Sequence, residues 1–73
     1  MAGVKIFPWS YYTKMCNDTV IMACFIEDEG WEIYYKRQDF PFMFAFGLPM
    51  VHKVDEVFDI AEGNIENYED MFK

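Results

Sequence analysis

The order of hydrophobic and polar positions predicts two neighbouring strands in the first half of the chain. Residues 20–26 are apolar throughout and lie between polar segments, which is typical of a central strand covered on both faces. In residues 31–37, Trp31, Ile33 and Tyr35 alternate with Glu32, Tyr34 and Lys36, which indicates a half-buried strand. Gly30 ends the short polar loop between the two runs and can supply the positive φ of a bulged hairpin. We therefore expect the two strands to pair antiparallel.

A third strand is predicted over residues 42–48, between Pro41 and Pro49, which keep it short. Strict alternation places on one side Phe42, Phe44, Phe46 and Leu48, and on the other Met43, Ala45 and Gly47. The small residues of the second side leave room for a helix. Residues 4–7 fit a further edge strand, whereas residues 9–17 fit a helical turn capped by Ser10 and an extended chain equally well.

The pattern changes to a helical period after Lys53. At about 100° per residue, the apolar side chains fall within an arc of roughly 160°, wide enough to seat a helix on a sheet. They are Val54, Val57, Phe58, Ile60, Ala61, Ile65, Tyr68, Met71 and Phe72. Gly63 followed by Asn64 is a helix-stop signal, so a break there would leave two short helices at an angle.

These elements predict an α+β fold, with a three- to four-stranded antiparallel sheet and a C-terminal amphipathic helix packed on one face. The length of 73 residues has room for one domain, residues 1–73. An apolar content of 53% and an aromatic content of 21% argue for a packed core in spite of the net charge of -7. No apolar run approaches the ~18 residues of a membrane span, and the first residues lack a secretion signal, so we expect a cytoplasmic protein.

The histidine and cysteine residues give no sign of a metal site or of catalysis. Cys16 and Cys24 match no metal-ligand spacing, and buried reduced thiols are the expected state. His52 has no serine or cysteine placed by a nucleophile motif. We therefore expect no enzyme, no cofactor and no bound metal, although a small-molecule cavity between sheet and helix stays open as an alternative.

The acidic side chains of the predicted helix form its second stripe, within an arc of roughly 100° opposite the apolar one. They are Asp55, Asp59, Glu62, Glu66, Glu69 and Asp70. Like charges at neighbouring turns cost about 0.2–0.5 kcal/mol each, and anions are disfavoured toward a helix C-terminus. With Glu56, the acids would follow ~22 Å of helix at about one charge per 3 Å, close to the ~3.4 Å per charge of one DNA strand.

The loop of the predicted hairpin carries a second acidic cluster, Glu27, Asp28 and Glu29. Turns collect such residues for their own reasons, so an ordinary polar loop is the competing interpretation. The loop is too short for a calcium-binding loop and lacks its alternating acids.

The charge excludes some partners and favours others. A sequence pI of about 4.4 argues against direct binding of nucleic acid and of anionic membranes, and favours a basic protein. The sequence predicts a non-enzymatic inhibitor whose acidic residues block the basic nucleic-acid-binding site of a partner, a nucleic-acid-handling complex. In size and charge alone it is similar to phage-encoded anti-CRISPR and anti-restriction proteins. The competing interpretation of the helix stripe is a solvated helix face.

The alternative function is a structural or regulatory subunit that forms a homodimer or a larger assembly through its aromatic residues. Trp9, Tyr11 and Tyr12 are candidates for such a contact, because Trp and Tyr are enriched at binding hot spots. Most of residues 39–49 is expected in the core, with Phe40 and Met43 the side chains left outside.

Overall fold

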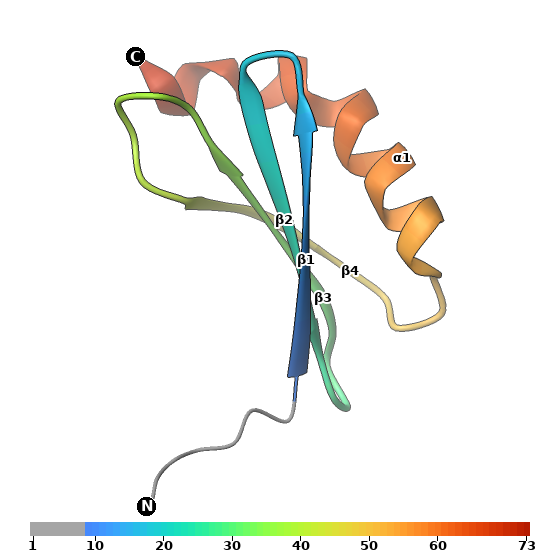
Figure 1. Cartoon of the computed structure of the whole chain (residues 1–73). Helices are drawn as coiled ribbons and strands as arrows, with labels where there is room; N and C mark the ends of the chain where they lie inside the picture. The colour runs from blue at the N-terminus through green and yellow to red at the C-terminus, as the bar shows by residue number, and fades with distance from the viewer. Residues whose placement is uncertain (1–8) are drawn as a thin grey trace, which may run out of the picture.

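The computed structural model describes residues 9–73 as a four-stranded antiparallel sheet followed by two helical segments (Figure 1). The strands follow one another in space as they do in the chain, in the order β1-β2-β3-β4. The elements are β1 Trp9–Cys16, β2 Thr19–Ile26, β3 Gly30–Lys36, β4 Met43–Leu48, the α-helix α1 Val54–Asn64 and the 3-10 helix η1 Ile65–Phe72. The predicted α+β class and the helix on one face of the sheet are confirmed. The edge strand predicted at residues 4–7 lies outside the described residues.

The two hairpin turns are made by residues that tolerate a left-handed backbone. Asn17 has a φ of 56° in the two-residue turn between β1 and β2, so residues 9–17 form an edge strand and its turn rather than a helical turn. Asp28 has a φ of 70° and Gly30 a φ of 113° at the turn between β2 and β3. The hairpin expected from Gly30 is therefore confirmed, with Ile26 opposite Gly30 at its end.

The core lies between α1 and the face of the sheet that carries Ile21, Ala23, Ile33 and Tyr35. From the helix, Val57, Phe58 and Ala61 are buried against these residues. Ile33 and Tyr35 share one face, as the alternation of residues 31–37 predicted, and both are buried.

Two hydrogen bonds fix α1 over this face. The Tyr35 hydroxyl donates to the carbonyl oxygen of Ala61, at 2.6 Å, in the last turns of α1. Burial raises the pKa of this tyrosine above its usual range, which keeps the donor protonated. At the other end, Trp31 Nε1 donates to the carbonyl oxygen of His52, at 3.1 Å, just before α1 begins. The position of the helix is thus set at both ends by side chains of β3.

The strict alternation predicted for residues 42–48 is wrong at Ala45. Ile33 faces Phe46 across β3 and β4, but Tyr34 faces Phe44, so one residue of β4 is extra. This bulge resets the period of two and turns Phe44 to the opposite face from Phe46. Phe44 is 54% exposed there and lies edge-to-face against Tyr34.

The prediction that Phe40 and Met43 stay outside is also wrong. The Phe40 ring packs against Phe72 with ring centroids 5.4 Å apart, and Met43 is half-buried, whereas Phe42 and Phe44 are exposed. Cys24 is buried and Cys16 is partly buried, and both are free thiols as expected.

The stop signal of Gly63 and Asn64 left a break of the C-terminal helix open, and the structure has one, since α1 ends at Asn64 and η1 begins at Ile65. Asn64 Nδ2 donates to the carbonyl oxygen of Ile60, at 2.8 Å, and Tyr68 inside η1 has a non-helical φ of -118°. A 3-10 helix has about 3.0 residues per turn, so the continuous α-helical arc that placed Glu66, Glu69 and Asp70 beside Asp55 is wrong. Over residues 9–73, no helix has the length and apolar character to cross a membrane.

Replacing Gly30 by alanine should destabilise the protein. At φ 113° an L side chain is strained, and the added Cβ would collide with the carbonyl oxygen of Leu48. We expect the free energy of unfolding, measured by urea denaturation, to fall by about 1–3 kcal/mol from backbone strain alone. The matched control is Gly63→Ala, whose Cβ meets nothing within 4 Å in α1 and should raise stability by up to about 1 kcal/mol. Equal stability of the two variants would contradict this account of the turn.

Candidate acidic binding surfaces

The acids of α1 divide into those that serve the fold and those that do not. Glu56 accepts a hydrogen bond from the Lys53 backbone N–H, at 3.0 Å, which closes the first turn of the helix and lowers the pKa of Glu56. Asp55 and Asp59 are exposed, and among residues 9–73 neither lies within salt-bridge distance of a cation. Val57, Phe58 and Ala61 face the sheet, so Asp55 and Asp59 are presented to solvent by the same amphipathic pattern that seats the helix.

Glu62 is tied to the sheet. Its carboxylate forms a salt bridge with Lys14 of β1, and this hydrogen-bonded pair raises the pKa of Lys14. Lys14 lies on the helix side of β1, because it pairs in register with the buried Ile21 of β2. Glu62 is therefore a contact between α1 and the edge strand, not a free charge of the stripe.

Glu69 is tied to the sheet more firmly. Arg37, directly after β3, donates from both terminal nitrogens to the two carboxylate oxygens of Glu69, at 2.6 and 2.8 Å. Arg37 Nε also donates to Thr19 Oγ1, at 2.9 Å, and the guanidinium lies over the Phe72 ring, 4.8 Å from its centroid. The hydrogen bonds from Arg37 lower the pKa of Glu69. This arrangement holds η1 against the end of the sheet.

The exposed acids that remain on the helical segments are Asp55, Asp59, Glu66 and Asp70. Asp70 is also close to Lys73, at 3.2 Å, but both side chains are largely exposed. Four acids over α1 and η1 give roughly one charge per 7 Å at the rise of the two helix types, about half the linear density expected from sequence. The predicted match to the charge spacing of a DNA strand is therefore wrong for the helical segments. The excess of negative charge remains.

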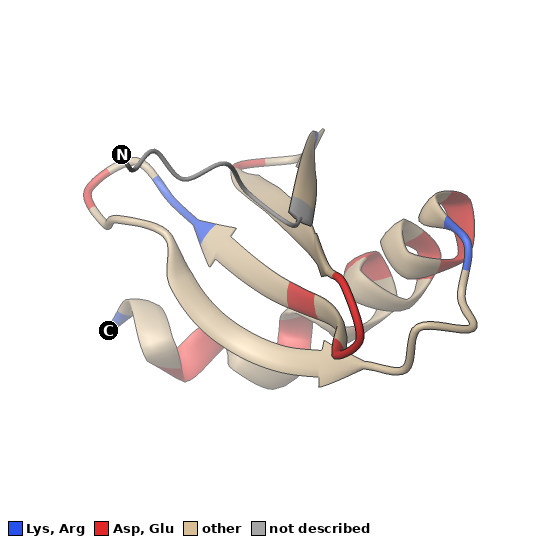
Figure 2. Cartoon of the chain, turned by 90° about the horizontal axis from the view of Figure 1, so that it is seen from below, with Lys and Arg blue, Asp and Glu red and all other residues tan. Residues whose placement is uncertain are grey.

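The tip of the β2–β3 hairpin carries the second acidic surface. Glu27, Asp28 and Glu29 are all exposed, and none lies within salt-bridge distance of a cation in the described part of the chain. Figure 2 shows this turn in red beside a red stretch of the neighbouring strand, with the blue segments in view away from it. The turn geometry of Asp28 and Gly30 holds these three side chains outward.

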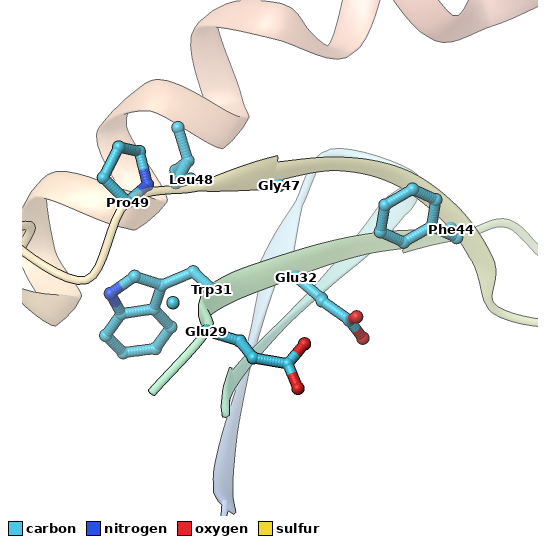
Figure 3. A pocket seen from close by; sticks show the side chains of 8 residues that line it. Glu29, Trp31, Glu32, Phe44, Gly47, Leu48 and Pro49 are labelled. Atoms are coloured by element: carbon cyan, nitrogen blue, oxygen red, sulfur yellow. The ribbon is translucent and has the colours of Figure 1, made fainter. Parts of the chain in front are cut away.

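A shallow hollow of about 360 Å³ lies next to the hairpin tip, between the ends of β3 and β4. Figure 3 shows the carboxylates of Glu29 and Glu32 on one side of it and the Phe44 ring farther along the strands. Tyr34 donates its hydroxyl proton to Glu32 Oε1, at 2.8 Å, which raises the pKa of Tyr34 to about 12. Glu32 belongs to this acidic region although the sequence pattern did not single it out.

The structure thus brings the predicted site residues to two separate places. Glu27, Asp28 and Glu29 stay together, whereas Glu62 and Glu69 leave the helix stripe to make contacts within the protein. Sequence reasoning missed the partners Lys14 and Arg37, because a helical projection counts only the cations of the helix itself. Residues 9–73 hold no group of three or more histidine, cysteine or acidic side chains arranged to bind a metal ion.

Comparison with known proteins adds no relative: no family model, no curated protein and no solved structure matches the chain.

The Arg37–Glu69 contact should stabilise the protein only above acidic pH. Because the pKa of Glu69 is lowered in the folded state, its contribution is complete above the ordinary carboxyl pKa and is lost as pH falls through the lowered value. We expect Glu69→Gln to lower the unfolding midpoint at neutral pH and to match the unsubstituted protein in strong acid. The control is Glu66→Gln, which removes an exposed neighbouring charge. A Glu69→Gln deficit that is the same at every pH would contradict the assignment.

Proposed function

We propose that this protein is a non-enzymatic inhibitor that binds a basic surface of another protein and keeps nucleic acid from it. The observation that carries the proposal is the large excess of unpaired negative charge. Of 13 acidic residues, four lie within 4.0 Å of a lysine or arginine nitrogen in the described part of the chain, Glu56 lies beside His52, and the other eight have no such neighbour there. Such a surface attracts basic partners and repels nucleic acid itself.

The division of the acids supports this use. Three acids stabilise the fold. Glu56 closes the first turn of α1, and Glu62 and Glu69 form salt bridges that hold α1 and η1 against the sheet. Among residues 9–73, Asp55, Asp59 and the hairpin-tip acids form no salt bridge. Their mutual repulsion opposes folding, so a role outside the fold accounts for them better than a role within it.

The class of target follows from the charge. Grooves that hold a phosphate backbone are lined by lysine and arginine, so an acidic protein can compete with the nucleic acid for them. Small acidic antagonists such as phage-encoded anti-CRISPR and anti-restriction proteins act in this way. Because the proposed target handles nucleic acid, we propose that the protein acts in the cytoplasm.

The test is capture of the partner with two charge-reversed proteins. One variant combines Asp55→Lys, Asp59→Lys and Glu66→Lys, and the other combines Glu27→Lys, Asp28→Lys and Glu29→Lys. Each is the other's control, because both change the net charge equally and neither touches an acid that ties α1 or η1 to the sheet. Tagged proteins are incubated with nuclease-treated bacterial lysate, washed at rising salt, and bound proteins are identified by mass spectrometry.

We expect the unsubstituted protein to retain a nucleic-acid-handling protein that high salt releases, and one of the two variants to lose it. The variant that loses the partner identifies the contact surface. Nucleic acid that the partner binds should also displace the inhibitor. A partner that both variants retain, or that salt does not release, would show that the acids are an ordinary solvated surface.

A further inference from the structure

Among residues 9–73, no helix or strand covers the face of the sheet opposite α1, and this face is not polar. We call it the open face, and its positions are Tyr11, Thr13, Met15, Val20, Met22, Cys24, Glu32, Tyr34, Lys36, Phe44 and Gly47, as the strand register requires. An antiparallel sheet with one solvated face alternates between apolar and polar side chains. Here only Glu32 and Lys36 are charged, while Met15 is 64% exposed and Phe44 is 54% exposed. This composition is that of a face that another surface covers.

The register arranges the open face in three rows that run across the strands. The middle row is Thr13, Met22, Tyr34 and Phe44. One flanking row is Tyr11, Cys24, Glu32 and Gly47, and the other is Met15, Val20 and Lys36. Glu32 and Lys36 therefore lie at equal distances on either side of Tyr34 along β3, about 6.7 Å each at the rise of a strand.

We propose that the open face binds the open face of a second copy of this chain, with the two β3 strands antiparallel across a twofold axis along the middle row. This operation places each middle-row residue over itself and each flanking row over the other. Glu32 then faces the partner's Lys36 twice. The usual angle of about 30° between packed sheets moves Glu32 and the partner's Lys36 apart by only ~3 Å, within reach of a lysine side chain.

The size of the open face fits a reversible dimer. Four strands about 4.8 Å apart and about 23 Å long present roughly 440 Å² on each copy, so the pair buries roughly 900 Å², slightly less than the ~1,000 Å² of a stable specific interface and the size of a weak, transient one. The helices and their exposed acids lie on the opposite face and stay accessible in the dimer. The inference is thus independent of the proposed inhibition. If both hold, the dimer presents two acidic surfaces and can bind two target sites.

The edge of the sheet offers a competing mode of self-association, by pairing of β1 with a second β1. β4 is an unsuitable edge, because it contains the bulge at Ala45 and lies between Pro41 and Pro49. Edge pairing leaves Glu32, Lys36 and Phe44 uncovered. The charge pair across the open face therefore distinguishes the two arrangements.

The test is sedimentation velocity of the full chain over a range of concentrations. We expect a monomer–dimer equilibrium that Glu32→Lys or Lys36→Glu alone weakens about tenfold or more, because each puts like charges opposite one another. The mixture of these two single variants should restore the dimer as a heterodimer, since one copy then carries two lysines and the other two glutamates. The double variant Glu32→Lys/Lys36→Glu should dimerise like the unsubstituted protein.

Two further variants control for composition and folding. Phe44→Asp should also weaken the dimer, whereas Val51→Asp should not, because Val51 is 82% exposed but lies outside the open face. Circular dichroism establishes that each variant is folded. A chain that stays monomeric at every concentration would overturn the proposal, as would a dimer that Glu32→Lys and Phe44→Asp leave intact, or single variants that fail to pair when mixed.

Discussion

The structure depends on one constraint: the only helical segments in residues 9–73, α1 and η1, which together form one helical arm, cover only one face of the four-stranded sheet. Helical segments α1 and η1 cover one face, and Tyr35 and Trp31 hold α1 there by donating to carbonyl oxygens near its two ends. All the buried side chains of the core cluster lie between the arm and that face. The other face has no element of this chain, within residues 9–73, to cover it. The core, the acidic surfaces and the open face all follow from this division.

The same constraint determines which acidic side chains form salt bridges with the sheet and which stay exposed. Glu62 and Glu69 occur where the helical arm passes over the edge and the end of the sheet, and there Lys14 and Arg37 reach them. Asp55, on the outward side of α1, forms no salt bridge with a cation in residues 9–73. The acids of the hairpin tip likewise form no salt bridge within the described part of the chain. Position relative to the sheet, rather than position on a helical wheel, decides which acids belong to the fold.

Much of the fold could be predicted from local patterns, and the failures have physical reasons. Gly30 and the apolar run of β2 identify the central hairpin because turn chemistry and period are properties of a short segment. The bulge at Ala45 could not be predicted, since it depends on how β4 meets β3 and leaves no mark in the alternation of residues 42–48. The edge strand β1 was ambiguous for a similar reason, because its exposed faces carry no burial pattern. The break at Asn64 was visible as a local stop signal.

The candidate site was predictable only in part. The hairpin-tip acids were found because a turn exposes whatever it carries, and the structure keeps them together. The helix stripe was overestimated because Lys14 and Arg37 come from segments distant in sequence. Their role requires the tertiary arrangement of three elements, which no periodicity in a single segment contains.

The central claim is that the unpaired acids are not part of what stabilises the fold. It is tested most directly by the unfolding midpoint of the unsubstituted protein, in dilute solution at neutral pH, as potassium chloride rises from about 0.01 M to about 0.15 M. Over that range the screening length falls from about 30 Å to about 8 Å. If repulsion among the free acids outweighs the few salt bridges, the midpoint rises with salt. A midpoint that falls with salt would show that the charges stabilise the fold, and would contradict the account.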